Sequence, residues 1–185
     1  IFVPNFLTER NMLGLLQSVV TIGIVACTMM FCLASRDFDL SVGSTVAFSG
    51  MIAVMVSNAS GSIVLGLLGA LLAGSVVGLV NGSVVSYLKV PSLIATLGMM
   101  ITLNGVAFMW SGGAPRGYLP DTFRFFGRYN ITDIPLISLL PIAVICLVVF
   151  GAILWWGLHR TNFGRMLHAV GDNPQAARLA GVPVQ

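Results

Sequence analysis

The pattern of hydrophobic and polar positions divides the chain into long uncharged stretches separated by short polar segments. Four stretches contain no Asp, Glu, Lys or Arg, and they cover residues 11–35, 40–88, 90–115 and 134–159. A hydrocarbon core about 30 Å thick takes roughly 20 apolar residues to cross as a helix. The second stretch has 49 residues and is long enough to cross twice. The pattern therefore predicts five membrane-spanning helices.

Turn-forming residues set the expected bounds of these helices. Asn58-Ala59-Ser60-Gly61 separates the second span from the third, Pro91 opens the fourth, and residues 111–115 end it. The predicted spans are 11–34, 40–57, 63–88, 91–110 and 134–158. Residues 111–133 then form the longest polar connection, and residues 160–185 form a polar segment that is too poor in apolar residues to span.

Composition narrows the fold class. The chain is 57% hydrophobic and only 8% charged, against about 25% charged in an ordinary soluble domain. The apolar runs are continuous, whereas strands of a membrane barrel alternate apolar and polar residues. We therefore predict an all-α membrane protein, a polytopic helical bundle whose solvent is membrane lipid. The net charge of +3 is carried by scattered residues, so no nucleic-acid partner is expected, and loop charges do not decide the orientation.

Small residues recur along the third predicted span. They stand four residues apart and are Gly66, Ala70, Gly74, Gly78 and Gly82. Residues four apart share one helix face, and a face of small side chains lets a neighbouring helix backbone come close. We predict that this stripe serves helix packing.

Polar side chains within or beside the spans are the candidates for a translocation path. They are Asn81, Asn104, Ser44 and Asp39. An amide at membrane depth needs a hydrogen-bond partner, and it either joins helices or lines a path. A carboxylate just before an apolar run can cap the helix that follows, but it is functional by default if the chain dips into the membrane there. The sequence leaves both interpretations of Asp39 open.

Cys27, Cys32 and Cys146 lie in predicted spans without a CxxC or Cys/His cluster, so no metal site is expected.

The polar segment 160–185 contains a short helix with strong end signals. Asn173 is a favourable N-cap, Pro174 suits the first helical turn, and Gly181 ends the predicted helix Pro174 to Ala180. The helix is expected to expose two polar residues and to offer three others for docking; the polar pair is Gln175 and Arg178, and the docking residues are Ala176, Ala177 and Leu179. A short capped helix suits a groove on a partner protein, but an ordinary surface helix between two spans explains the segment equally well.

A family resemblance adds to this interpretation. The run Gln175 to Gly181 resembles the EAA-x3-G signature in the cytoplasmic loop of ABC importer permeases, with Gln in place of Glu. Further stretches resemble the permeases of bacterial monosaccharide importers for ribose, xylose, galactose and arabinose, and one of them, Phe31–Ser35, looks most like the arabinose permease. These stretches are Gly164–Arg165, Ala169–Pro174, Asp37–Gly43, Gly78–Gly82 and Phe31–Ser35. They follow the order of the family along the chain.

The resemblance implies a fold and a mode of action. It implies a type II ABC importer-like fold in the inner membrane, with residues 160–185 in the cytoplasm and the loop 111–133 in the periplasm. The implied coupling residues, which would contact an ATPase subunit, are Asn173, Pro174, Gln175, Ala176, Ala177, Arg178, Leu179 and Gly181. The implied partners are that ATPase subunit, a second permease copy and a periplasmic sugar-binding protein. The neutral Gln175 leaves any ion pair at the ATPase contact in doubt.

The expected function is import of a monosaccharide, L-arabinose or a similar pentose or hexose. The chain is not expected to be an enzyme or to bind a cofactor, because a P-loop needs lysine followed by Ser or Thr and its one lysine, Lys89, precedes Val90. Three alternatives stay open. They are a branched-chain amino acid ABC permease, an ion-coupled secondary transporter, which usually carries intramembrane carboxylates, and a membrane-embedded enzyme. His159 and His168 stand too far apart in sequence for an i, i+4 metal pair. We expect the chain to be a fragment with further spans on both sides.

Overall fold

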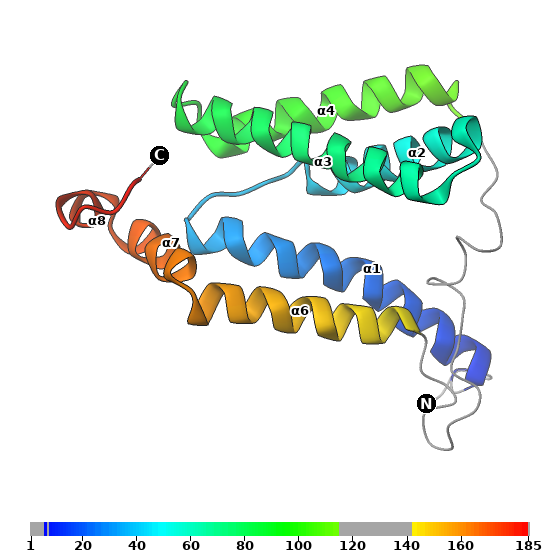
Figure 1. Cartoon of the computed structure of the whole chain (residues 1–185), viewed down its shortest axis with the longest axis horizontal. Coiled ribbons are helices and arrows are strands. Elements are labelled where there is room, and N and C mark those ends of the chain that lie inside the picture. The colour runs from blue at the N-terminus through cyan, green and yellow to red at the C-terminus, as the bar shows by residue number, and fades with distance from the viewer. Residues whose placement is uncertain (1–5, 7, 115–141, 185) are drawn as a thin grey trace. The chain divides into compact units, whose positions relative to one another are not determined.

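The computed structural model describes residues 6, 8–114 and 142–184 (Figure 1). Its helices are α1 (Glu9–Ala34), α2 (Val42–Ser60), α3 (Ile63–Ser86), α4 (Ser92–Ser111), α6 (Ile142–Arg160), α7 (Asn162–Asp172) and α8 (Pro174–Leu179). Within the described residues, five helices are long and apolar enough to cross a membrane, namely α1, α2, α3, α4 and α6. The prediction of an all-α protein with five membrane-spanning helices is confirmed.

The second span is shifted toward the C-terminus relative to its predicted bounds of 40–57. Asn58 and Ser60 do not break α2, because each side chain donates a 2.7 Å hydrogen bond to the carbonyl four residues earlier in the helix. The helix continues to Ser60, and the turn follows at Gly61, whose φ of 68° suits a residue without a side chain. At its other end α2 begins at Val42 rather than Leu40, since the residues before it are held in an extended path described below.

Other helix ends also differ from the prediction. Pro91 is the N-cap of α4 and not its first residue. The predicted third span reached residue 88, whereas α3 ends at Ser86, and Lys89 takes a φ of 57° in the link that follows. Residues 134–141 of the predicted fifth span, and the loop 115–133, lie outside the described residues.

The sequence interpretation missed α7. Residues 160–173 were predicted only to be polar and too poor in apolar residues to span, but residues 162–172 are helical. Apolar residues recur there at helical spacing, at Phe163, Met166, Leu167 and Val170. That periodicity was the available signal, and the low apolar content of the whole segment obscured it.

The chain folds into two compact units, which are described separately. The unit formed by residues 1–31 and 120–168 contains most of α1, together with α6, and these two helices run side by side (Figure 1). A methyl group on Gly23 of α1 would come within 2.8 Å of the Leu147 side chain, and Gly151 of α6 faces Cys27. These two glycines lie where side chains of α1 and α6 meet.

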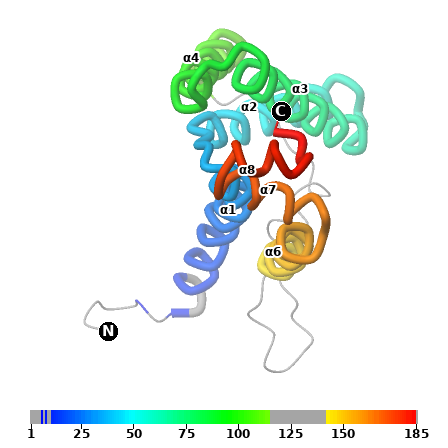
Figure 2. Tube along the Cα trace, turned by 90° about the vertical axis from the view of Figure 1, so that its left-hand side faces the viewer, coloured from blue at the N-terminus to red at the C-terminus, as the bar shows by residue number. Residues whose placement is uncertain are grey.

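The other unit, residues 32–119 and 169–185, contains α2, α3 and α4. These helices form one group in both views (Figures 1 and 2), with α2 against both of the others. Gly66 of α3 is buried against α2, where an added methyl group would lie 2.6 Å from the Ala53 carbonyl oxygen and 2.9 Å from Cβ of Ser57. A methyl group on Gly69 would make a looser contact, 3.3 Å from the Val56 side chain and 3.4 Å from that of Ile52.

The predicted stripe of small residues does not have one environment along its length. Gly66 is packed as above, Ala70 is half-buried, and a methyl group on Gly74 would lie 3.4 Å from Ser49 Oγ. Gly78 and Gly82 are exposed, and a methyl group on either would meet no atom within 4 Å. The first part of the stripe faces α2, and the last part faces open space.

Candidate functional site

An extended segment, residues 37–41, joins α1 to α2 and is bonded to side chains of α4. The Phe38 N–H donates to Ser92 Oγ at 3.4 Å, and the Leu40 N–H donates to Thr96 Oγ1 at 3.1 Å. Ser92 and Thr96 stand on successive turns of α4, and Thr96 is only 3% exposed. Non-helical backbone at a membrane-embedded helix end needs such partners. The two hydroxyls therefore fix the path of the segment.

A chain of hydrogen bonds then runs from this segment to α3. Asp39 Oδ1 accepts from the Ser41 N–H at 2.8 Å and from the Ser41 hydroxyl at 2.6 Å. The Asn81 side-chain amide donates to Ser41 Oγ at 2.9 Å. Ser41 is fully buried and Asn81 is 7% exposed. Ser41 has one hydroxyl hydrogen and gives it to Asp39, so only the NH₂ group of Asn81 can face it.

Three of the four path candidates meet in this region. Asp39 and Asn81 are joined through Ser41, and the buried Ser44 donates back to the Ser41 carbonyl at 2.8 Å within the first turn of α2. Asn104 is exposed on α4 and makes no hydrogen bond to the described residues. Asp39 accepts an N–H beside the start of α2, as a capping residue does, and also links the segment to α3.

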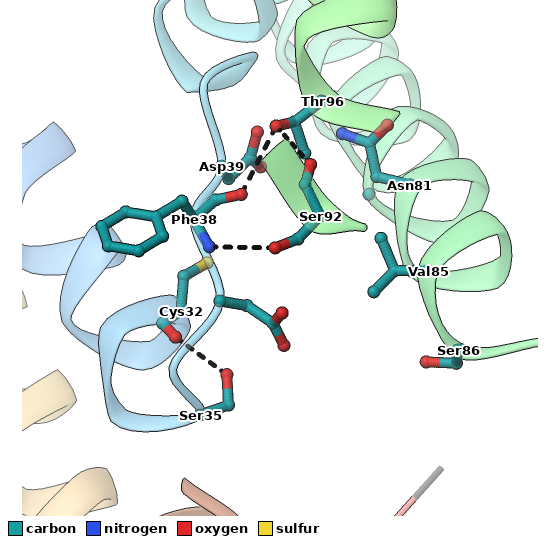
Figure 3. A pocket seen from close by; sticks show the side chains of 12 residues that line it. Cys32, Ser35, Phe38, Asp39, Asn81, Val85, Ser86, Ser92 and Thr96 are labelled. Carbon is teal, nitrogen blue, oxygen red and sulfur yellow. Dashed lines mark hydrogen bonds between the residues drawn. The ribbon is translucent and has the colours of Figure 1, made fainter. Parts of the chain in front are cut away.

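A pocket of about 330 Å³ opens beside this network (Figure 3). Its polar lining includes Asp37, Asp39, Asn81, Ser86, Ser92 and Thr96. Cys32, Val85, Gly78 and Gly82 form part of the remaining wall. Figure 3 shows the amide nitrogen of Asn81 turned toward the side of the pocket that carries Asp39. The two glycines at the end of the α3 stripe thus border a cavity and not a neighbouring helix.

Sequence reasoning missed two residues of this site. Ser41 and Ser92 were not among the path candidates, although Ser41 is bonded to Asn81 and Ser92 to the extended segment. A signal was present, because hydroxyls at positions 92 and 96 share one helix face. Nothing local indicated which segment that face would meet.

The predicted coupling residues form a well-capped helix, α8. Asn173 Oδ1 accepts from the N–H groups of Gln175 and Ala176, each at 3.0 Å. The helix ends at Leu179, one residue before the predicted end, and Gly181 follows with a φ of 80°. Pro174, Gln175, Ala176 and Arg178 are exposed.

Two members of α8 differ sharply in exposure. Ala177 was expected to be available for docking, but it is only 4% exposed. This expectation is wrong because the side chain points inward. Leu179 is 92% exposed.

The segment before α8 touches the C-terminal end of α1. Gly171, in the last turn of α7, is buried, and a methyl group there would overlap the Ala34 carbonyl oxygen and come within 3.4 Å of Ser35 Cα. Only glycine allows this approach of the two backbones. Ala34 is the last residue of α1, and the extended segment 37–41 begins three residues later. The α7–α8 segment therefore packs against the end of α1, three residues before the extended segment that lines the pocket.

His159 and His168 lie closer together than their separation in sequence suggested. The tight corner between α6 and α7 places their ring centroids 6.1 Å apart. The corner requires Gly164, because a methyl group there would overlap the Leu158 carbonyl oxygen. Within the described part of the chain, no three His, Cys, Asp or Glu residues form a group that could hold a metal ion.

Comparison with known proteins places these features in a family. Residues 11–185 match the family described as the permease component of the branched-chain amino acid transport system. The chain belongs to this permease family. Together with its five apolar helices, this makes it a multi-pass protein of the inner membrane. No solved structure matches the permease.

Named relatives of the permease include sugar transporters. It is 45% identical over 186 residues to the L-arabinose ABC transporter permease protein of Azospirillum brasilense, covering 98% of this chain and 52% of the relative. It is 45% identical over 184 residues to the L-arabinose transport system permease protein of Escherichia coli, covering 100% and 54%. A ribose import permease of Escherichia coli is 33% identical over 185 residues, covering 98% and 56%. The resemblance noted in the sequence is confirmed, and the chain spans about half the length of these relatives.

Proposed function

We propose that this permease is the membrane-spanning subunit of an ATP-driven importer that carries a monosaccharide, L-arabinose or a similar pentose or hexose, across the inner membrane. The observation that carries the proposal is 45% identity over nearly the whole chain to two permeases named for L-arabinose. The competing substrate is a branched-chain amino acid, after the description of the family.

The pocket favours the sugar over the amino acid. An amino acid carries a carboxylate, which is best held by arginine, lysine or a helix N-terminus. The residues that line the pocket include two aspartates and no arginine, lysine or histidine, so only the N-terminus of α4, at Ser92, is left to hold such a carboxylate. A neutral polyol, in contrast, donates its hydroxyl hydrogens to carboxylate and amide oxygens. The chemistry of the lining therefore supports a neutral substrate.

Energy enters, in this proposal, through α8. A separate ATPase subunit binds the cytoplasmic segment 160–185, with Leu179 as the apolar anchor in its groove. Closure of the ATPase moves α8 and the end of α7, and the contact of Gly171 with Ala34 passes that movement to the extended segment 37–41. A second permease copy and a periplasmic sugar-binding protein complete the importer.

The test is uptake of labelled L-arabinose by the full-length permease assembled with its ATPase and binding protein in membrane vesicles. Leu179→Asp places a charge in the proposed ATPase contact, and we expect uptake to fall about tenfold or more. Leu179→Met keeps an apolar anchor and should retain uptake. Both variants should reach the membrane and unfold at the wild-type temperature, because Leu179 is 92% exposed.

Two results would contradict the proposal. Undiminished uptake by Leu179→Asp would show that α8 does not couple the permease to the ATPase subunit. Uptake of leucine by the wild-type importer, with no uptake of any monosaccharide, would overturn the assigned substrate.

A further inference from the structure

The geometry points to the pocket beside Asp39 as a binding site for one monosaccharide, held through its hydroxyl groups by Asp39, Asn81 and Ser92. This inference rests on the proposed function and assigns a place in the molecule where the sugar binds. In the proposed topology the pocket lies near the cytoplasmic end of the path.

The size of the pocket suits a single sugar ring. Its volume of about 330 Å³ is near the lower limit of ligand pockets, which run from about 300 to 1,000 Å³. A monosaccharide fits such a space, whereas a long oligosaccharide does not. All twelve lining residues belong to the unit that contains α2, α3 and α4.

The hydrogen-bond network leaves specific groups available to a ligand. Because Asn81 must give an N–H to Ser41, its amide oxygen and its second N–H are left for another partner. The second carboxylate oxygen of Asp39 is bonded to none of the described residues. Ser92 Oγ accepts from the Phe38 N–H and keeps its own hydrogen to donate. Acceptors and donors thus stand together, as a polyol requires.

These groups are held in place before any ligand arrives. Asn81 is 93% buried, as its 7% exposure implies, and Ser41 fixes the orientation of its amide. Asp39 is held by two hydrogen bonds to one oxygen, at 2.6 and 2.8 Å. A ligand that binds preorganised side chains pays little entropy for ordering them. The amide oxygen of Asn81 is not among the buried atoms without a partner, so it is accessible to a ligand that supplies a donor.

The charge of the lining selects against other small ligands. Asp37 and Asp39 repel an anion, and no basic lining residue offsets them. Two carboxylates are too few to enclose a metal ion by themselves, and no group of three candidate ligands occurs among the described residues. Hydroxyl groups donate strong, charge-assisted hydrogen bonds to carboxylates. A neutral polyol is the ligand class that fits.

Cys32 offers a direct test, because its side chain lines the pocket. The experiment uses the full-length permease, assembled with its ATPase and binding protein, in which Cys32 is the one remaining cysteine. The rate at which a small maleimide modifies Cys32 is measured with and without L-arabinose. At a sugar concentration ten times the Kd, mass action leaves about one site in eleven empty. We therefore expect modification to slow about tenfold.

Variants separate binding at this site from a distant effect. Asn81→Ala should abolish the protection of Cys32 by sugar. Asp39→Asn, which preserves the shape of the network, should weaken the protection and guards against a folding defect in Asn81→Ala. Asn58→Ala is the matched control, since Asn58 is exposed and bonds only to Val54 within α2; it should leave the protection unchanged.

Several outcomes would overturn the inference. If Cys32 is modified at the same rate with and without sugar, sugar does not bind in this pocket. Full protection of Cys32 in both Asn81→Ala and Asp39→Asn would also contradict the inference. Protection by sodium or magnesium chloride without sugar would identify a cation site instead. Uptake measured on the same preparation distinguishes the two proposals. If L-arabinose is transported but Cys32 is not protected, this site fails alone, whereas absence of transport of any monosaccharide contradicts the proposed function.

Discussion

The two ends of α3 carry the same sequence pattern and meet different surroundings. At one end, Gly66 presses against α2, so that an added methyl group would collide with the Ala53 carbonyl oxygen and the Ser57 side chain. At the other end, Gly78 and Gly82 line a pocket and have no neighbour within 4 Å of a would-be methyl group. The spacing of small residues is identical along the stripe, so the partner decides what each glycine does.

The partner changes because α2 does not extend along the whole of α3. It begins at Val42, and beyond that point the extended segment 37–41 takes its place. An extended backbone is held to α4 by the hydroxyls of Ser92 and Thr96, and it leaves space beside the glycines that a helix would have filled. The late start of α2 thus accounts for the pocket, whereas the tight pair forms where α2 is present.

The largest effect is expected from filling the packed end of the stripe. Gly66→Leu forces a side chain into the Ala53 carbonyl and Ser57, and we expect a cost of about 3 kcal/mol in the free energy of unfolding, the upper end of the usual range for overpacking. Gly78→Leu is the matched control and should be neutral or stabilising by up to about 1 kcal/mol, because leucine favours a helix over glycine. Reversible unfolding of the purified full-length permease in mixed micelles measures both. Equal destabilisation by the two variants would remove the contrast.

A smaller effect is expected from the hydroxyls that hold the extended segment. Thr96→Val keeps the shape of the side chain but leaves the Leu40 N–H without its acceptor, which costs about 1–3 kcal/mol. Thr102→Val is the control on the same helix. Thr102 is exposed and donates only to the Gly98 carbonyl, so its loss should stay within about 0.5 kcal/mol. The same unfolding assay compares them, and an indifferent Thr96→Val would show that the segment does not depend on this bond.

The smallest effect on stability is expected at the open end of the stripe. A larger side chain there should instead reduce the access of reagents to the pocket. Gly82→Leu places a side chain in the pocket without displacing an atom, so the free energy of unfolding should change by less than about 1 kcal/mol. Modification of Cys32 by a small maleimide should become slower than in the wild type, even without sugar. Leucine at Gly14, which also has no neighbour within 4 Å and lies at the far end of α1, should leave that rate unchanged. Unaltered labelling in Gly82→Leu would show that Cys32 is reached by another route.

The residues themselves determined the class of the protein. Long uncharged stretches need lipid around them whatever their tertiary contacts, and the five apolar helices follow from this alone. Asn173, Pro174 and Gly181 set the ends of α8 through bonds and backbone angles that reach only a few residues along the chain. Asn58 and Ser60 also follow local rules. Their side chains bond to carbonyl groups within α2, so the helix continues through both residues.

Tertiary structure alone decided which polar groups meet. Asn81 bonds to Ser41, 40 residues away, and Leu40 bonds to Thr96, 56 residues away. The contact of Gly171 with Ala34 spans a still longer distance along the chain. Periodicity identifies the face of a helix but not the segment that will cover that face, because the covering is settled by the packing of all the helices together. The sequence therefore determined a membrane protein with a capped polar helix, and the fold determined that its uncharged spans enclose a pocket lined by two aspartates.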